Sequence, residues 1–581
     1  MNKIISIAET CKRCNNANCS KYCPIHINIP MINSFVSMGK FDLATDVLFR
    51  QNPFPYVTSL LCDHEKQCFG NCIFKNVSYY NVENKLANEY FDKLIDYPSN
   101  LKDSNVIIIG GGITGLTVAH YLLKSGLKPT IYEKNKLGGV ITSSIPSFRF
   151  DKTLFLKHIN EIENHCNIIY QEVDENLLNS FDESTKVILA TGASIESRSL
   201  LSDNVYAGID LLNKINLGQF NISNKKIGVI GLGNTACDVA RSLKKLNNNV
   251  HIVYRRDIES SPASKKELES LICEGITINE CLTPLKYENN ILYFHKNKLI
   301  QKENEKRKSI IETDEEVYLE FDLIVEAIGS KPDDYLIKSL LKNDYLKYLE
   351  DKKIISDYYH YKNIYIGGDG YYGAWNIAKA IYSGQKIFEA ICPTYIFGGS
   401  FNPITMAHSS IIDYVSGIGN LIIVPNGDRY QLKNLMNFNI RKEMIEIELS
   451  KLNNNHNITI SEFERSTEYK GSIELLRYYN HPTMVIGDDC LYTMKTWIKA
   501  EQLIKENKFL VIARKSSLDE INLFIQCDNL FSKYQDNFEV IDILDDDKKT
   551  LSSSDFRDNL NIKNISKEVL EYIQSNKIYE V

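Results

Sequence analysis

Half of the fourteen cysteines of this 581-residue chain lie within its first 72 residues. They form a run spaced C-x2-C-x4-C-x3-C-P and a later group of three, namely Cys11, Cys14, Cys19 and Cys23, then Cys62, Cys68 and Cys72. Thiolates in such a ferredoxin-like run hold iron–sulfur clusters, and crowded cysteines in a reducing compartment indicate metal rather than disulfides. A structural zinc site is the alternative, but zinc sites generally use shorter, paired C-x2-C units. The segment therefore predicts iron–sulfur binding.

A glycine-rich turn follows this cysteine segment. Gly110, Gly112 and Gly115 have the G-x-G-x-x-G spacing between an apolar run at 106–109 and a helical pattern. These glycines allow a tight turn, close approach of a pyrophosphate and close helix–strand packing. The next strand, 129–132, ends in Glu133, which can accept hydrogen bonds from both ribose hydroxyls and would repel a 2′-phosphate. The pattern predicts binding of the ADP half of FAD or NAD, with a purely structural turn as the alternative.

A second turn of this kind begins after an apolar run at 227–230. Its G-x-G-x-x-A fingerprint consists of Gly231, Gly233, Asn234, Thr235 and Ala236. The following strand, 250–254, ends in Arg255 and Arg256 instead of an acid. Two guanidinium groups at the tip that meets the adenosine 2′ position favour a 2′-phosphate, so NADPH is expected over NADH. A solvated pair of arginines is the alternative.

The elements that must position these residues require several domains, because 581 residues exceed one hydrophobic core. The net charge of −7 and the pI near 6.0 argue against a nucleic-acid platform, and the basic run at 296–308 is interpreted as a solvated hairpin insertion. No apolar run reaches the ~18 residues of a membrane span, and the N-terminus has no signal-peptide core. We therefore expect a cytoplasmic protein that binds neither membrane nor nucleic acid.

The cysteine runs, the first fingerprint, the G-G-V at 138–140 and the Ile-Pro at 145–146 resemble the small subunit of glutamate synthase and the N-terminal half of dihydropyrimidine dehydrogenase, over residues 1–392. The resemblance implies one [4Fe-4S] cluster on Cys11, Cys14, Cys19 and Cys72, and part of a second on Cys23, Cys62 and Cys68. Thr58 stands where the glutamate synthase pattern has an eighth cysteine, and the comparable helix is expected to offer only Asn88 or Glu89 as a substitute ligand. Together with the fingerprint, the FAD site is expected to include Gly110, Gly112, Gly115, Glu133, Gly139, Val140, Gly192, Gly368 and Asp369.

From residue 393 on, four segments resemble the nucleotidyltransferases, and among them the nicotinate/nicotinamide mononucleotide adenylyltransferases. They are G-G-S-F-N-P-I-T-M-A-H at 398–408, V-P-N-G-D-R-Y at 424–430 with Lys433 and Arg441, V-I-G-D-D-C-L at 485–491 with Trp497, and S-S-S-D-F-R at 552–557. The resemblance implies that His408, Thr405 and Arg557 act on ATP and Mg²⁺, and that Trp497 stacks on a pyridine ring. The implied ATP site comprises Gly399, Ser400, Phe401, Gly487, Asp489, Ser553 and Ser554.

We therefore expect a multidomain α/β protein: a small α-helical iron–sulfur domain, two interleaved Rossmann-like three-layer domains and a C-terminal Rossmann-like nucleotidyltransferase domain. The expected boundaries are 1–100 for the iron–sulfur domain, 101–222 and 336–392 for the FAD-binding domain, 223–335 for the NADPH-binding domain, and 393–581 for the transferase. Residues 29–49 are expected to be helical, and the last helix of the FAD-binding domain is expected to span residues 374–391. Electrons would pass from NADPH through FAD and a [4Fe-4S] cluster to a protein acceptor outside the chain. The transferase would move AMP from ATP to nicotinate mononucleotide. The alternatives are a redox-sensing flavin module without turnover, and a nucleotidyltransferase of another specificity, such as one acting on phosphopantetheine.

Overall fold

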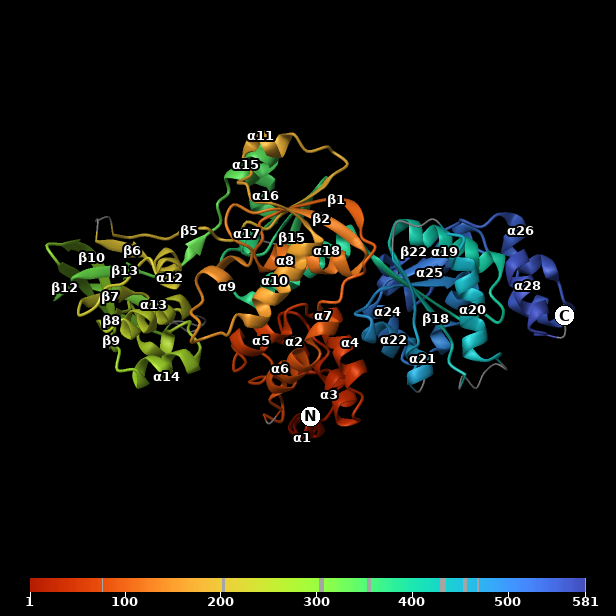
Figure 1. The fold of residues 1–581 in the computed structure, drawn as a ribbon, viewed down its shortest axis with the longest axis horizontal. Helices are drawn as coiled ribbons and strands as arrows, with labels where there is room; N and C mark the ends of the chain where they lie inside the picture. Colours follow the sequence, from red (N-terminus) through yellow and green to blue (C-terminus); the bar gives the residue numbers. More distant parts are fainter. Residues whose placement is uncertain are drawn as a thin grey trace. The chain divides into compact units, whose positions relative to one another are not determined.

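The computed structural model describes residues 1–75, 77–200, 204–301, 308–352, 357–428, 435–452, 457–467 and 470–579 (Figure 1). By its internal contacts the chain divides into two compact units: one comprises residues 1–97, 103–123 and 128–387, and the other residues 98–102, 124–127 and 388–581. In the described part of the chain no helix is long and apolar enough to cross a membrane.

The N-terminal part of the first unit is entirely helical. Its helices are α1 (Asn2–Glu9), α2 (Asn18–Lys21), α3 (Ile29–Ser37), α4 (Phe41–Gln51), α5 (Pro55–Leu61), α6 (Tyr79–Glu89) and α7 (Phe91–Leu94). The segment 29–49, predicted to be helical, is divided between α3 and α4 by a turn in which Gly39 has φ +71°. Glycine adopts this left-handed conformation without a steric penalty, so the chain reverses there and α3 packs on α4.

The FAD-binding domain is built on a six-stranded sheet in the order β15-β16-β4-β1-β2-β3, parallel except for the β15–β16 pair. The strands are β1 (Lys102–Ile109), β2 (Leu127–Tyr132), β3 (Asn167–Ile169), β4 (Lys186–Leu189), β15 (Tyr358–Tyr361) and β16 (Ile364–Gly367). The helices include α8 (Ile113–Lys124), α9 (Gly139–Ser143), α10 (Thr153–His165), α11 (Glu175–Asn179), α15 (Tyr335–Leu341), α16 (Tyr345–Asp351), α17 (Asp369–Tyr372) and α18 (Ile377–Ile391). The sequence predicted α18 to begin at residue 374, which is wrong by three residues.

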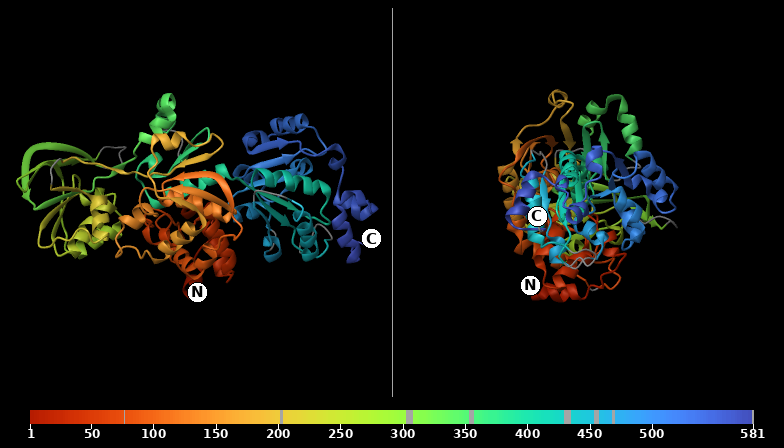
Figure 2. Two further views of the ribbon diagram at one scale, coloured as in Figure 1. Left: turned by 45° about the horizontal axis from the view of Figure 1, so that its top comes forward. Right: turned by 90° about the vertical axis from the view of Figure 1, so that its right-hand side faces the viewer.

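The domain expected to bind NADPH has a five-stranded parallel sheet in the order β6-β13-β7-β8-β9. Its strands are β6 (Val205–Ala207), β7 (Lys226–Ile230), β8 (Asn249–Val253), β9 (Thr277–Asn279) and β13 (Leu323–Glu326), and its helices are α12 (Gly208–Asn216), α13 (Asn234–Lys245) and α14 (Lys265–Cys273). A three-stranded antiparallel sheet, β10 (Leu282–Glu288), β11 (Ile291–Ile300) and β12 (Ser309–Glu320), is inserted before β13 (Figure 2, left, yellow-green). In the basic run at 296–308, predicted to be a hairpin insertion, residues 296–300 are the end of β11, which pairs with β12 in antiparallel orientation. Residues 302–307 lie outside the described residues.

The second unit contains a six-stranded parallel sheet in the order β19-β18-β17-β20-β21-β22, that is, 3-2-1-4-5-6 in sequence order. Its strands are β17 (Thr394–Gly399), β18 (Asn420–Pro425), β19 (Ile458–Ile460), β20 (Thr483–Gly487), β21 (Phe509–Ile512) and β22 (Phe538–Ile541). The helices used below are α19 (Met406–Ile418), α20 (Phe438–Leu449), α23 (Asp488–Thr493) and α27 (Ser553–Asn559). In a doubly wound sheet of this order, ligands bind at the carboxyl ends of the strands where the order reverses, here between β17 and β20.

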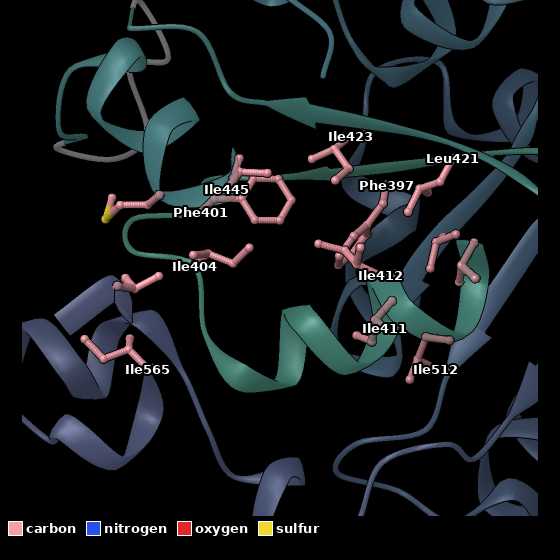
Figure 3. Packing of buried hydrophobic residues seen from close by; sticks show 14 of the residues in the cluster. Phe397, Phe401, Ile404, Ile411, Ile412, Leu421, Ile423, Ile445, Ile512 and Ile565 are labelled. Carbon is pink, nitrogen blue, oxygen red and sulfur yellow. The ribbon is translucent and has the colours of Figure 1, made fainter. Parts of the chain in front are cut away.

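One core of this domain joins the first transferase motif to the C-terminal helices. Phe397, Phe401 and Ile404 pack with Ile412, and further members of the cluster include Ile411, Leu421, Ile423, Ile445, Ile512 and Ile565 (Figure 3). Because Phe401 is fully buried, its side chain supports the turn from within, and only its backbone is available to a ligand.

Candidate functional site

The first glycine turn is shaped to admit a phosphate. Gly110 has φ +108°, and a Cβ there would lie 2.4 Å from the carbonyl oxygen of Ala190; a Cβ on Gly115 would lie 2.1 Å from the oxygen of Gly110. A Cβ on Gly112, in contrast, would meet nothing within 4 Å. The outer two glycines are therefore needed for packing, and the space over Gly112 fits a pyrophosphate at the start of α8.

Glu133 is held beside this turn by backbone amides. The Gly111 N–H donates to its Oε2 at 2.7 Å and the Asn135 N–H donates to its Oε1 at 2.8 Å. Each carboxylate oxygen has further acceptor capacity, so the side chain is oriented to receive ribose hydroxyls. The Gly138 N–H donates to the Gly111 oxygen at 2.7 Å, which brings the loop carrying Gly139 and the exposed Val140 to the same turn.

The second half of the predicted FAD site reaches this turn from β16. Gly368 has φ +64°, and a Cβ there would lie 2.2 Å from Thr114 Oγ1 on α8. Burial raises the pKa of Asp369 to about 6, and its Oδ1 accepts a hydrogen bond from the Trp375 N–H at 3.3 Å. Gly370 lies close to Gly192, since a Cβ on Gly370 would be 3.3 Å from the Gly192 nitrogen. The structure thus brings together Gly110, Gly112, Gly115, Gly192, Gly368 and Asp369.

The second glycine turn, expected to bind NADPH, repeats the geometry of the first. Gly231 has φ +115°, and its Cβ would lie 2.4 Å from the Ala327 oxygen, whereas a Cβ on Gly233 would meet only Pro262 Cγ at 3.8 Å. Helix α13 starts at Asn234, whose Oδ1 accepts a hydrogen bond from the Ser264 N–H at 3.1 Å, and continues through Thr235 and the fully buried Ala236. Space for a pyrophosphate is therefore open over Gly233.

The two arginines at the tip of β8 have different surroundings. The Nε of Arg256 donates to the Lys308 oxygen at 3.0 Å, and the Arg255 oxygen accepts from Asn297 Nδ2 at 2.8 Å. The Arg255 side chain is exposed, whereas that of Arg256 is half-buried. Arg255 is therefore the guanidinium more accessible to a ligand, and Arg256 the one fixed by the inserted sheet.

We expect Arg255→Ala combined with Arg256→Ala to weaken NADPH binding more than NADH binding, because only NADPH carries the 2′-phosphate. Losing a charge-assisted hydrogen bond costs about 1.5–3 kcal/mol, or about 10- to 100-fold in affinity. The measurement is the Kd of each coenzyme, titrated into protein from which the flavin has been removed. The control is Lys214→Ala, which removes a cation on α12. Equal weakening of both coenzymes would show that the arginines do not read the phosphate.

The predicted ligands of cluster one line a single pocket in the helical domain. Cys11, Cys14, Cys19 and Cys72 surround it together with Cys68. All fourteen cysteines are free thiols in the described structure. Burial raises the pKa of Cys19 to about 11, so metal binding here must displace a proton from the thiol. Thiols that line one pocket are the donors an iron–sulfur cluster uses, so the chemistry of these residues fits such a cluster.

The remaining cysteines group around a buried carboxylate that the sequence did not point to. Burial is the main cause that raises the pKa of the thiols of Cys23, Cys62 and Cys68, and the nearby charge of Glu83 raises all three further. Glu83, on α6, is 4% exposed, and its Oε1 accepts from Thr58 Oγ1 at 2.8 Å and from Asn52 Nδ2 at 2.9 Å. Burial also raises the pKa of Glu83 to about 8, against the effect of these two hydrogen bonds.

The expectation that this helix offers only Asn88 or Glu89 is therefore wrong. Both are exposed: Asn88 Nδ2 donates to the Asn84 oxygen at 2.7 Å, and Glu89 pairs with Lys85. Glu83 lies instead among the buried positions of α6, with Tyr79, Val82, Leu86 and Ala87. The sequence signal that could have revealed Glu83 is an acid at a position of the helix where its neighbours on the same face are apolar. Thr58, in place of the eighth cysteine, donates to the carboxylate that can act as the oxygen ligand.

We expect Glu83→Ala to reduce the iron content of anaerobically prepared protein from about eight to about four atoms per chain, because one [4Fe-4S] cluster loses its fourth ligand. Since oxygen binds iron less well than thiolate does, the wild-type second cluster should be the more chelator-sensitive one, and Glu83→Cys should make it resistant. Glu89→Ala is the control. Loss of iron equal in Glu89→Ala and Glu83→Ala, or eight firmly held irons in Glu83→Ala, would contradict the assignment.

In the second unit, the S-S-S-D-F-R segment is bonded to the first transferase motif. Ser553 Oγ donates to the Pro403 oxygen at 2.7 Å, and Arg557 Nη1 donates to the Asn402 oxygen. Ser552 caps α27, its Oγ accepting from the Asp555 N–H at 3.0 Å, and Ser554 is exposed. The two segments expected to share the ATP phosphates, 150 residues apart, therefore meet.

His408 is fixed by the residue that caps its own helix. The Thr405 N–H donates to His408 Nδ1 at 3.1 Å, and Thr405 Oγ1 lies 2.7 Å from the same nitrogen. Because Nδ1 is an acceptor, the proton of the neutral ring is on Nε2. Thr405 also accepts a hydrogen bond from the His408 N–H, completing a capping box at the start of α19. The imidazole thus presents an N–H donor at a helix N-terminus, where anions are favoured.

Arg441 serves the structure of this turn. It is completely buried, and it donates to the backbone oxygens of Ser400 at 2.9 Å, Asn426 at 2.6 Å and Met436 at 2.7 Å, and to Asp428 at 3.2 Å. The guanidinium joins the end of β17 to the segment after β18, where Gly399 also accepts a hydrogen bond from the Asn426 N–H. Arg429, Tyr430 and Lys433 lie outside the described residues.

In the G-D-D segment the two acids have separate roles. Asp488 is completely buried, and its Oδ2 accepts from the backbone N–H groups of Lys515 at 2.7 Å and Ser516 at 2.8 Å, which fixes the loop after β21. Asp489 is half-buried, and its Oδ1 accepts a hydrogen bond from the Cys490 N–H at 3.0 Å. It lies two residues after Gly487, the last residue of β20. Trp497 packs partly against the core of this domain. The sequence alone did not indicate this structural role of Asp488.

Three family models match successive parts of the chain. Residues 1–93 match dihydropyrimidine dehydrogenase domain II with a 4Fe-4S cluster, residues 104–384 match pyridine nucleotide-disulphide oxidoreductases, and residues 396–559 match the cytidylyltransferase-like domain. These matches, the two parallel sheets and the mainly parallel sheet of β1–β4, β15 and β16 confirm the predicted fold class.

Similar proteins are found among oxidoreductases. The chain is 26% identical over 430 residues to the oxidoreductase AegA of Escherichia coli (strain K12), covering 66% of this chain and 64% of AegA. It is 28% identical over 315 residues to the glutamate synthase [NADPH] small chain of the same organism, covering 49% of this chain and 66% of the small chain. It is 28% identical over 370 residues to the NADPH-Fe(3+) oxidoreductase subunit beta of Geobacter sulfurreducens (strain DL-1 / KN400), covering 57% of this chain and 53% of that subunit. The chain spans at most 66% of the length of these relatives. It thus carries an iron–sulfur domain and paired dinucleotide-binding domains of the glutamate synthase small-chain type, followed by a cytidylyltransferase-like domain.

Proposed function

We propose that residues 1–392 form an NADPH-dependent oxidoreductase and that residues 393–581 form an adenylyltransferase acting on nicotinate mononucleotide. The observation that carries the first half is the pair of glycine turns with open space over Gly112 and Gly233. The observation that carries the second half is the contact of the Ser553 and Arg557 segment with the loop preceding Thr405 and His408.

In the oxidoreductase, bound FAD would convert the two-electron chemistry of nicotinamide into single-electron steps suited to iron–sulfur clusters. The protein supplies binding and orientation. Glu133 receives the FAD ribose, the amides at the start of α8 receive its pyrophosphate, and Arg255 receives the 2′-phosphate of NADPH. Cys11, Cys14, Cys19 and Cys72 would hold cluster one, and Cys23, Cys62, Cys68 and Glu83 would hold cluster two.

In the adenylyltransferase, the phosphate of the mononucleotide attacks the α-phosphorus of ATP and pyrophosphate leaves. No protein nucleophile is required, so the domain contributes positioning and charge stabilisation. The Nε2–H of His408 and the guanidinium of Arg557 would stabilise the negative charge that develops on the leaving pyrophosphate. Asp489 and Trp497 are assigned to the adenosine and the pyridine ring. Mg²⁺ bound to the ATP phosphates would add positive charge at the same place.

We expect nicotinate mononucleotide to be used with a higher kcat/KM than the amide, because the G-G-S-F-N-P opening favours the acid-specific type. The measurement is the rate of pyrophosphate release with nicotinate mononucleotide, nicotinamide mononucleotide or phosphopantetheine, each in the presence of ATP and Mg²⁺. A preference for nicotinamide mononucleotide would overturn the substrate assignment, and turnover of phosphopantetheine alone would overturn the proposed reaction.

Sustained NADPH-dependent reduction of ferricyanide tests the proposed oxidoreductase function of residues 1–392. Reduction that stops after a single turnover would favour a redox-sensing module.

A further inference from the structure

The pocket of cluster one opens to a part of the surface that is both cationic and apolar. Cys11, Cys14, Cys19 and Cys72 are all partly exposed, whereas in the second group only Cys62 is partly exposed and Cys23 and Cys68 are buried. The first cluster is therefore the more accessible of the two to another protein. Electron transfer between proteins requires the two redox centres to come close, so this face is the exit for electrons.

Residues 10–23 and 69–79, which carry these partly exposed cysteines, have cations and no acids. The nearest acids in the sequence are Glu9, Glu65 and Glu83. Residues 10–23 contain Lys12, Arg13 and Lys21, and residues 69–79 contain Lys75. All four side chains are exposed, and Arg13 Nη2 donates to Ser37 Oγ at 2.8 Å, which orients it on the domain surface. This local excess of positive charge stands out on a chain whose net charge is −7. Such a patch attracts anionic partners and increases their rate of association.

The same face exposes large apolar side chains beside a predicted ligand. Ile73 and Phe74 follow Cys72 directly, line the cluster-one pocket, and are 62% and 47% exposed. An apolar centre with a charged rim is the anatomy of a protein-binding surface rather than of a small-molecule site.

We propose that the face formed by residues 11–14 and 72–75 docks a small anionic protein that accepts one electron. This inference rests on the oxidoreductase function proposed above, and it identifies the electron acceptor as a protein of negative surface charge. Each NADPH gives up a hydride and becomes NADP⁺; its two electrons reduce two carrier molecules, one each, and one proton is released to solvent.

The test uses two probes with the same haem and opposite surface charge: native cytochrome c, which is rich in lysine, and succinylated cytochrome c, whose lysines carry carboxylates. NADPH-dependent reduction of each is measured anaerobically with the full chain over a range of ionic strengths. The succinylated form should be reduced with the higher kcat/KM, and its rate should fall as salt screens the attraction. Lys12→Glu combined with Lys75→Glu should lower that kcat/KM about tenfold or more. It should also remove the salt dependence.

The control is Lys338→Glu, which makes the same charge change on α15 of the FAD-binding domain, where it should have little effect. Iron content and the rate of flavin reduction by NADPH must be equal in all variants, so that a lost cluster is not mistaken for a lost docking surface. A preference for native cytochrome c, or equal rates without salt dependence while ferricyanide is reduced normally, would overturn the docking surface and leave the oxidoreductase intact. Failure to oxidise NADPH with any acceptor, ferricyanide included, would contradict the proposed function itself.

Discussion

Replacing Gly112 with valine should give a folded protein that no longer binds FAD or oxidises NADPH. Nothing lies within 4 Å of the Cβ position at Gly112, so the substitution is sterically tolerated in the protein without ligand. The valine methyl groups would then fill the place where the backbone must approach the pyrophosphate. We expect retention of secondary structure by circular dichroism, loss of the visible flavin absorbance after gel filtration, and NADPH oxidation at background level.

Gly233→Val is the matched control, because that glycine has the corresponding place in the second turn and its nearest neighbour is Pro262 Cγ at 3.8 Å. This variant should keep its FAD but fail to bind NADPH. Dithionite should still reduce its flavin. Retention of FAD by Gly112→Val, or loss of FAD by Gly233→Val, would show that the two turns have been assigned to the wrong nucleotides.

His408→Ala should reduce kcat for adenylyl transfer about 10²- to 10³-fold, the usual effect of removing one preorganised donor to a developing anion. The ring is positioned by Thr405, whose N–H donates to Nδ1 at 3.1 Å and thereby leaves Nε2 as the donor. Thr405→Val keeps that backbone donor but loses the hydroxyl beside Nδ1, so its effect on kcat should be smaller. The measurement is pyrophosphate release with saturating ATP and nicotinate mononucleotide.

His481→Ala is the control for this variant, since His481 belongs to the same domain but its Nδ1 bonds to Asn507 Oδ1 at 2.8 Å. It should retain nearly full transfer activity. If His408→Ala kept more than about a third of the wild-type kcat while folded normally, the histidine would not be the donor to the leaving group.

The sequence predicted the parts of this protein in which one local pattern determines both structure and chemistry. The two fingerprints are such parts, because a strand, a turn with positive φ at Gly110 or Gly231 and a helix N-terminus must follow one another in the chain. The predicted boundary of α18 missed by three residues, since helix ends depend on local capping contacts.

What the sequence did not predict depends on contacts between distant segments. Glu83 faces the second group of cysteines only because α5 packs against α6, which brings Thr58 to its carboxylate. Asp488 fixes a loop that comes 26 to 28 residues later. Arg441 joins three backbone segments around the first transferase motif. In each case a charged residue at a buried position was the visible signal, but its partners required the fold.

The central claim is that one chain carries two separate reactions, and the most direct test measures both reactions in the same preparations. NADPH oxidation with ferricyanide and pyrophosphate release from ATP with nicotinate mononucleotide are assayed in wild type, Gly112→Val and His408→Ala. The account predicts that Gly112→Val loses only NADPH oxidation and that His408→Ala loses only pyrophosphate release. Severe loss of NADPH oxidation in a well-folded His408→Ala protein would contradict it and would favour a flavin module that regulates the transferase.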